Sequence, residues 1–173
     1  MRVLLAIDFD GAAQIHPLVE RFLASCAELP SIDVAILSAR DSDDVRRRIG
    51  GVQAIIAGDV LRGGGKRAAL RTIAQRVGAG HVVYAGGDLP ALEYAARCGR
   101  AIFMDRDGRD APPIAQLRHA ANVEALCYGF ARELIDVVPE AIPGLLAYRT
   151  PARTSSTCAA RTIVAPAVSD GSS

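Results

Sequence analysis

Short apolar runs alternate with segments of helical period along most of the chain. Each run is brief and branched enough to form a buried strand; the runs cover residues 3–7, 33–38, 52–57, 81–85 and 100–104. The stretches between them have helical spacing or helix-start signals; they cover residues 17–29, 41–49, 66–77, 88–98 and 112–121. Strands that alternate with helices predict an α/β fold, in which a Rossmann-like parallel sheet of about five strands carries helices on both faces.

The alternation stops after residue 121, and this divides the chain into three parts. Residues 1–121 are expected to form the α/β core, and residues 122–149 a helical extension without a further strand. The helical period covers residues 123–138, and Pro139 and Pro143 then interrupt it. Residues 150–173 are rich in Ser, Thr, Ala and Pro, which predicts a disordered tail.

Composition narrows the function classes. The formal net charge is +1, which argues against nucleic-acid or membrane partners. No run of about 18 apolar residues is present, so a cytoplasmic location is expected. The four cysteines show no C-x-x-C spacing and indicate free thiols. Lys66 is the only lysine in a chain that otherwise uses arginine, and this makes its position informative.

The first strand ends in two carboxylates. Asp8 and Asp10 follow the apolar run and precede Gly11. Because alternate strand residues share a face, the two acids are expected to point the same way, with Phe9 opposite. Neighbouring carboxylates are costly unless a divalent cation or a shared proton neutralises them. The carboxyl edge of an open α/β sheet is also where ligands bind, although two solvated acids at a strand end remain an alternative.

Four motifs in order resemble those of the haloacid dehalogenase (HAD) superfamily of phosphohydrolases. Asp8-Phe-Asp-Gly11 resembles motif I, Ser38 in Leu37-Ser-Ala-Arg40 resembles motif II, and Lys66 at a helix start resembles motif III. Residues 82–93, which contain Gly86-Gly-Asp88, resemble motif IV. The sugar-phosphate phosphatase branch, which includes trehalose-phosphate phosphatases, is the most similar.

The resemblance implies a mechanism and a cofactor. Asp8 would be the nucleophile that forms an aspartyl-phosphate, and Asp10 the acid/base that protonates the leaving group. Ser38 and Lys66 would bind the transferring phosphoryl group. Mg²⁺ would bind Asp8, the backbone carbonyl of Asp10 and an acid of motif IV, for which Asp88 is preferred. The implied partner is a phosphorylated small molecule, for instance a phosphosugar.

The chain departs from the family pattern at two motifs. Aligned through Gly99, the acids of the family's G-D-x-x-x-D become Gly87 and Ala91, and only a shifted alignment gives Asp88 and Glu93. The threonine usual after the motif I glycine is Ala12. These departures keep open a catalytically degenerate relative, acting as a phosphate-, metal- or protein-binding module.

The spacing of the motifs leaves no room for a substrate-covering cap domain. Asp10, Ser38 and Lys66 are separated only by the strands and helices already predicted. A capless protein would act on a large substrate or obtain a lid from a partner, for instance in a homo-oligomer. A response-regulator receiver is a third alternative, because Asp59 follows a strand and Asp8 and Asp10 form an acidic pair; it lacks the expected lysine after its fifth strand, where Met104-Asp-Arg106 stands.

Overall fold

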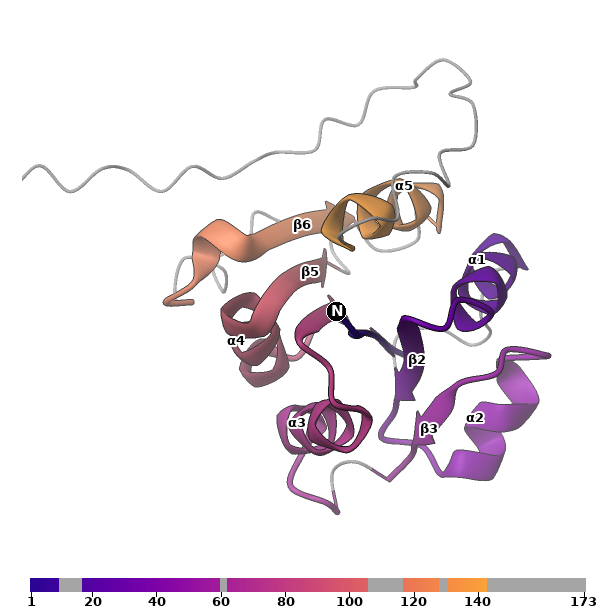
Figure 1. Cartoon of the computed structure of the whole chain (residues 1–173). Helices are drawn as coiled ribbons and strands as arrows, with labels where there is room; N and C mark the ends of the chain where they lie inside the picture. Colours follow the sequence, from indigo (N-terminus) through magenta and orange to yellow (C-terminus); the bar gives the residue numbers. More distant parts are fainter. Residues whose placement is uncertain (10–16, 60–61, 106–116, 128–130, 143–173) are drawn as a thin grey trace, which may run out of the picture.

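Six parallel strands form the central sheet in the computed structural model, which describes residues 1–9, 17–59, 62–105, 117–127 and 131–142 (Figure 1). The strands are β1 (Val3–Asp8), β2 (Ile32–Leu37), β3 (Ile55–Ala57), β4 (His81–Gly86), β5 (Gly99–Asp105) and β6 (Val123–Cys127). Their order across the sheet is β3-β2-β1-β4-β5-β6. The chain therefore builds outwards from β1 to β3 and then returns to the other side of β1 with β4.

Helices cover both faces of this sheet, as the sequence pattern predicts. They are α1 (Pro17–Ala27), α2 (Ser42–Arg48), α3 (Lys66–Val77), α4 (Leu89–Cys98) and α5 (Ala131–Ala141). In Figure 1, α3 and α4 lie on one side of the strands, and α1, α2 and α5 lie on the other. The predicted three-layer α/β architecture is confirmed.

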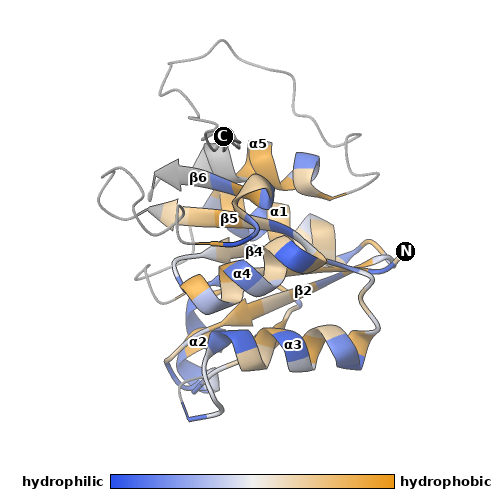
Figure 2. Cartoon of the chain, turned by 90° about the vertical axis from the view of Figure 1, so that its left-hand side faces the viewer, coloured by the Kyte–Doolittle hydropathy of each residue, from blue (hydrophilic) through white to orange (hydrophobic). Residues whose placement is uncertain are grey.

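The two faces of the sheet bury two separate apolar layers. Leu4 and Ala6 of β1 face α3 and α4, whereas Leu5 and Ile7 face the opposite helices. This alternation follows from the two-residue period of a strand, and it places Phe9 on the side opposite Leu4 and Ala6. In Figure 2 strands β2 and β5 are coloured as hydrophobic, whereas α3 and α4 carry both polar and apolar residues. Strands buried on both faces are typical of parallel sheets.

The sixth strand contradicts one sequence-based expectation. Residues 123–127, for which the helical period predicts part of a helix, instead form β6 and pair in parallel with β5. The paired segment Val-Glu-Ala-Leu-Cys is short, and a short apolar run does not distinguish strand from helix by period alone. Exposed backbone groups at the edge of β5 are satisfied by the new strand, and this tertiary pairing overrides the local preference.

The helix predicted over residues 112–121 is not found at its described end. Residues 117–119 form no α-helix, and a short 3-10 turn, η2 (Ala120–Asn122), leads into β6. Residues 112–116 lie outside the described residues, as does the expected tail at 150–173. Helix α5 covers the later part of the predicted 123–138 helix and continues through Pro139 to Ala141, so the prediction that Pro139 ends the helix is wrong. Among the described residues, no helix is long and apolar enough to cross a membrane.

Strand order removes the receiver alternative. Receivers have the flavodoxin-like order 2-1-3-4-5, in which the chain crosses over after its second strand. Here the reversal comes after β3, so that β1 lies between β2 and β4. Asp59 therefore follows β3 near the outer edge of the sheet rather than beside Asp8.

Candidate active site

Asp8 ends the central strand at the point where the strand order reverses. β1 pairs with β2 on one side and β4 on the other, and chain connections leave in opposite directions from these neighbours. In open α/β sheets this switch point forms the ligand-binding crevice at the carboxyl ends of the strands. Asp8 shares the face of Leu4 and Ala6, and it therefore points toward the layer that contains α3 and α4.

Lys66 meets Asp8 directly. The Lys66 Nζ lies 2.8 Å from each carboxylate oxygen of Asp8. The side chains are 11% and 9% exposed, respectively, so the ion pair is nearly buried. Burying one of these charges without the other would be strongly unfavourable. The structure thus brings Asp8 and Lys66 together at the end of β1.

The loop before α3 explains how Lys66 reaches the site. Gly64 and Gly65 have φ angles of 91° and 88°, in a region that side chains other than glycine rarely adopt. The turn they allow places Lys66 at the first position of α3. Its side chain then crosses from the helix to the end of β1.

Tyr84 is a third member of this cluster that sequence reasoning did not identify. Its hydroxyl donates a hydrogen bond of 3.1 Å to Asp8 Oδ2. Burial raises the pKa of Tyr84 above its usual range, and the negative charges of Asp8 and Asp88 raise it further. The phenol is thus a hydrogen-bond donor to the Asp8 carboxylate.

Ser38 directly follows β2 and is fully buried. β2 runs beside β1, with Leu37 opposite Asp8. The Ser38 hydroxyl accepts a hydrogen bond from the Arg40 backbone N–H at 3.1 Å, and the Ser38 backbone N–H donates to Ala57 at the end of β3. Ser38 thus lies at the predicted edge, and its hydroxyl already helps to shape the loop after β2.

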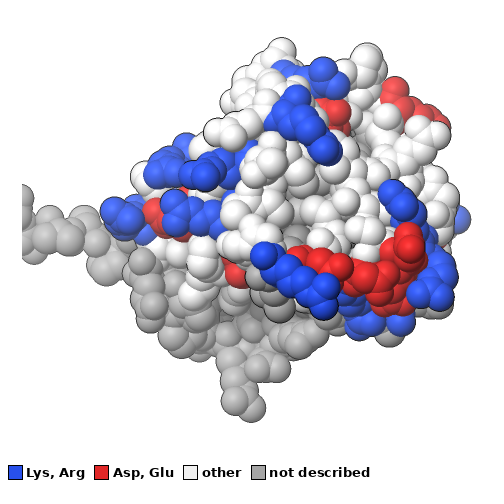
Figure 3. Space-filling view, turned by 90° about the horizontal axis from the view of Figure 1, so that it is seen from below, with Lys and Arg blue, Asp and Glu red and all other residues white. Residues whose placement is uncertain are grey.

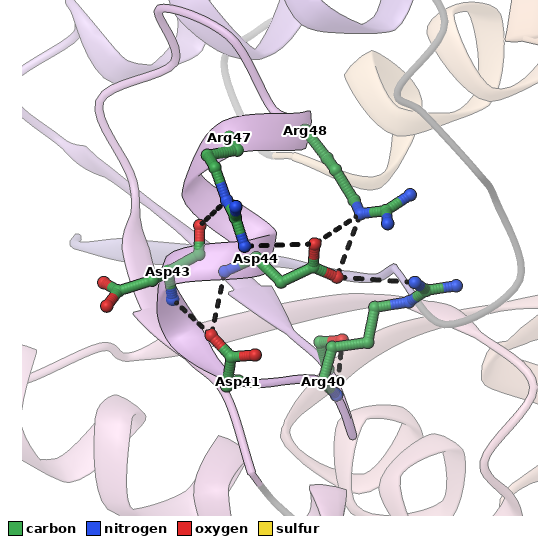
Figure 4. A network of polar contacts seen from close by, with 7 residues as sticks. Arg40, Asp41, Asp43, Asp44, Arg47 and Arg48 are labelled. Carbon is green, nitrogen blue, oxygen red and sulfur yellow. Dashed lines mark hydrogen bonds and ion pairs between the residues drawn. The ribbon is translucent and has the colours of Figure 1, made fainter.

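A charged network holds the other end of that loop (Figure 4). The Asp41 carboxylate caps α2 by accepting from the backbone N–H groups of Asp43 and Asp44. Asp44 binds Arg48 at 2.9 Å and Arg40 at 3.4 Å. These arginines lower the pKa of Asp44. In Figure 3 acidic and basic side chains form a mixed band on the lower right of the surface, where α2 lies.

Asp88 begins α4 and acts as its N-cap. Its Oδ1 accepts a hydrogen bond of 2.9 Å from the backbone N–H of Ala91. Since the charge of Asp88 also raises the pKa of Tyr84, the carboxylate lies near the same phenol that contacts Asp8. Tyr84 therefore lies near two carboxylates, Asp8 at the end of β1 and Asp88 before α4.

Asp10 and Glu93 are the two remaining candidate acids. Asp10 lies outside the described residues. Glu93, the second acid of the shifted motif IV alignment, points toward the segment after β5, where Arg118 and His119 each lie 3.8 Å from its Oε1. Within the described ranges, no group of three or more His, Cys, Asp or Glu side chains is arranged to hold a metal ion.

The sequence contained a signal for Tyr84. It is the only aromatic residue in β4, and its neighbours across the sheet are Ala6 and Ala101. Two small residues beside a large one leave room for its ring. The strand order is required to recognise this, because Ala6 and Tyr84 become neighbours only when β4 pairs with β1.

Comparison with solved structures identifies the fold. The deoxy-D-mannose-octulosonate 8-phosphate phosphatase (YrbI) of Haemophilus influenzae, in a cobalt-bound form, matches with a TM-score of 0.57 and 24% identity, over 80% of this chain and 87% of that chain. The 3-deoxy-D-manno-octulosonate 8-phosphate phosphatase of Moraxella catarrhalis, in complex with magnesium, phosphate and its KDO molecule, matches with a TM-score of 0.58 and 23% identity, over 84% and 90%.

A probable YrbI-family phosphatase from Pseudomonas syringae pv. phaseolica also matches, with a TM-score of 0.51 and 20% identity, over 83% of this chain and 88% of that chain. No family model matches the chain, and no curated protein does. These likenesses confirm the predicted Rossmann-like α/β fold. The first two of these structures are phosphatases of an octulosonate 8-phosphate, and the third is a probable phosphatase of the YrbI family.

Proposed function

We propose that this protein hydrolyses a phosphomonoester, with Asp8 as the nucleophile. The observation that carries the proposal is the nearly buried pair of Asp8 and Lys66 at the switch point of the sheet. A carboxylate there is held by two donors instead of being solvated, and its ammonium partner suits the charge of a phosphoryl group. The HAD-like fold supports the same reading.

The proposed reaction has two steps. An oxygen of Asp8 forms a bond to phosphorus while the bond from phosphorus to the alcohol oxygen breaks, and the alcohol leaves with a proton that the resemblance assigns to Asp10. Water then attacks the phosphorus of the aspartyl-phosphate, which releases inorganic phosphate and restores the carboxylate. Lys66 would stabilise the charge on the phosphoryl oxygens in both steps. Ser38 would donate a hydrogen bond to them after its loop adjusts.

The residues present fit a magnesium ion. Asp8 and Asp88, which both lie near the Tyr84 hydroxyl, would supply carboxylate oxygens, and Mg²⁺ prefers oxygen ligands. The backbone carbonyl of Asp10 is the third ligand that the resemblance implies. When bound, Mg²⁺ would neutralise charge on the phosphoryl oxygens.

A phosphosugar is the proposed substrate class, because the similar structures are phosphatases of a phosphorylated sugar acid. With no cap domain among the described residues, a second subunit or a partner would supply any lid. A panel of sugar phosphates and other phosphomonoesters with Mg²⁺, assayed with wild type and Asp8→Asn, tests the proposal. Hydrolysis that depends on Asp8 supports it, and a wild type inactive on the whole panel contradicts it.

A degenerate, non-catalytic relative is the second candidate, and one observation favours it. Asp88, the preferred acid of motif IV, uses Oδ1 to cap α4, and Gly87 and Ala91 cannot replace it. Such a protein would retain an anion or metal site without turnover. Phosphate binding by a wild type that hydrolyses no substrate would support this alternative.

Asp88 is tested by a substitution that preserves its capping role. Asparagine caps helices about as well as aspartate, so Asp88→Asn should change the free energy of unfolding by less than about 0.5 kcal/mol. Loss of the negative charge should raise the Mg²⁺ concentration for half-maximal activity at least about tenfold. Asp41→Asn makes the same change at the cap of α2 and should leave the Mg²⁺ dependence unaltered. An unaltered dependence in Asp88→Asn would limit Asp88 to capping.

Lys66 is tested by its closest replacement in charge. Lys66→Arg should weaken vanadate or phosphate binding at least tenfold, about 1.4 kcal/mol, in calorimetry with Mg²⁺. The reason is shape, because a broad planar guanidinium cannot replace a compact ammonium that lies 2.8 Å from both oxygens of Asp8. Arg67→Lys exchanges the same residue types in the next position of α3 and serves as the control. Equal affinities for wild type and Lys66→Arg would remove Lys66 from the anion site.

A further inference from the structure

Tyr84 is among the largest side chains that are fully buried in the protein. It lies in the core between β4 and the helices α3 and α4, with 0% exposure. Burying a phenol is favourable only when its hydroxyl finds a partner, and here the partner is a carboxylate of the proposed active site. A phenylalanine would fill the same space without that polar requirement, so packing alone does not explain the tyrosine.

Lys66 and Tyr84 both donate to the Asp8 carboxylate, but they constrain it in different ways. Lys66 Nζ is equidistant from the two carboxylate oxygens, at 2.8 Å each, and it stands on a flexible four-carbon chain. Tyr84 donates to Oδ2 from a rigid ring that is buried in the core layer beneath α3 and α4. The lysine therefore balances the charge of the carboxylate, whereas the tyrosine sets the direction of its plane.

Gly86 provides the space for this arrangement. A Cβ at position 86 would clash with Asp8 Cβ and would lie 2.5 Å from the Tyr84 hydroxyl oxygen. The absent side chain thus allows β4 to bring the phenol against the carboxylate. The contact is part of how β1 and β4 fit together at the switch point.

We propose that Tyr84 is a positioning residue, whose hydroxyl orients the Asp8 carboxylate for attack on phosphorus. The inference rests on the proposed function, and it gives a role to a tyrosine that lies within the motif IV segment, where the resemblance assigns it none. The hydroxyl acts through Asp8 and forms no bond to substrate. A misdirected nucleophile slows the chemical step more than it weakens binding.

Tyr84→Phe tests this role, with Tyr94→Phe as the matched control. Tyr94 is also a buried tyrosine, on α4, and hydrogen-bonds to Cys98 rather than to the site. For p-nitrophenyl phosphate with Mg²⁺, we expect Tyr84→Phe to lower kcat at least tenfold and to change KM by less than about twofold. Tyr94→Phe should alter neither. Wild-type kcat in Tyr84→Phe, or a loss that appears equally in both variants, would overturn the proposal.

A second measurement does not depend on turnover. Beryllium fluoride forms an adduct with aspartate carboxylates that mimics an aspartyl-phosphate, and ¹⁹F NMR with Mg²⁺ reports its formation on the protein. We expect the adduct in wild type and Tyr94→Phe, and at least tenfold weaker formation in Tyr84→Phe. Equal formation in all three would overturn the inference, and so would its absence from wild type. If wild type forms the adduct but hydrolyses no phosphoester, the proposed function fails. The comparison of adduct formation between wild type and Tyr84→Phe still tests whether Tyr84 orients Asp8.

Discussion

Asp8→Asn should reduce phosphatase turnover at least about a thousandfold, the largest effect expected of any substitution in this chain. An amide cannot form the acyl-phosphate, and the bond-forming oxygen is therefore lost rather than misplaced. The side chain is nearly isosteric, but its single oxygen replaces two acceptors, and the change removes the negative charge that pairs with Lys66. Initial rates on the best substrate of the panel measure the effect.

The matching control is Asp33→Asn, which removes an acid from β2 that pairs with Arg2 at the protein surface. Surface pairs contribute little, and this variant should keep wild-type rates. Unfolding curves of both variants establish that they remain folded. Equal turnover by wild type and Asp8→Asn would assign the activity to another residue or to a contaminant.

The second large effect is expected at Gly86, which contacts the site without contributing chemistry. Gly86→Ala would place a methyl group against Asp8 Cβ and the Tyr84 hydroxyl, where two central strands allow little movement. Overpacking of this kind costs about 1–3 kcal/mol, and we expect the upper end because both contacts lie in the sheet interior. Urea unfolding measures the loss, and residual activity should fall with it because Asp8 moves.

Gly51→Ala is the control for this substitution. A Cβ at position 51 would meet nothing within 4 Å, and its stability change should stay within about 0.5 kcal/mol. If Gly86→Ala proved as stable and active as Gly51→Ala, the close approach of β4 to Asp8 would be wrong.

The fold was predictable because its strands are buried on both faces. Continuous apolar runs such as residues 3–7 and 81–85 give a strong signal, and the alternation with helices then implies a parallel sheet. The sixth strand was not predictable, because residues 123–127 are few and fit a helix equally well. Only the unpaired edge of β5 distinguishes the two, and this information is not local to the segment.

The residues of the site, like the strands, were only partly predictable from the sequence. Asp8 and Lys66 stood out by type and position, one at a strand end and the other as the single lysine, and the structure brings them together. Tyr84 was not predicted, because its hydroxyl reaches Asp8 only when β4 pairs with β1. Asp88 combines capping with nearness to the site, and sequence shows the residue type without deciding between these roles. Asp10 stays a prediction.

Trapping the intermediate tests the central claim most directly. Wild-type protein is quenched in acid during turnover and treated with borohydride, which reduces an acyl-phosphate to an alcohol, and the peptide that contains Asp8 is sequenced by mass spectrometry. The proposed function predicts homoserine at position 8, present with substrate and absent without it or in Asp8→Asn. Rapid phosphate release with an unmodified Asp8 at every quench time, or a modified residue elsewhere, would contradict it.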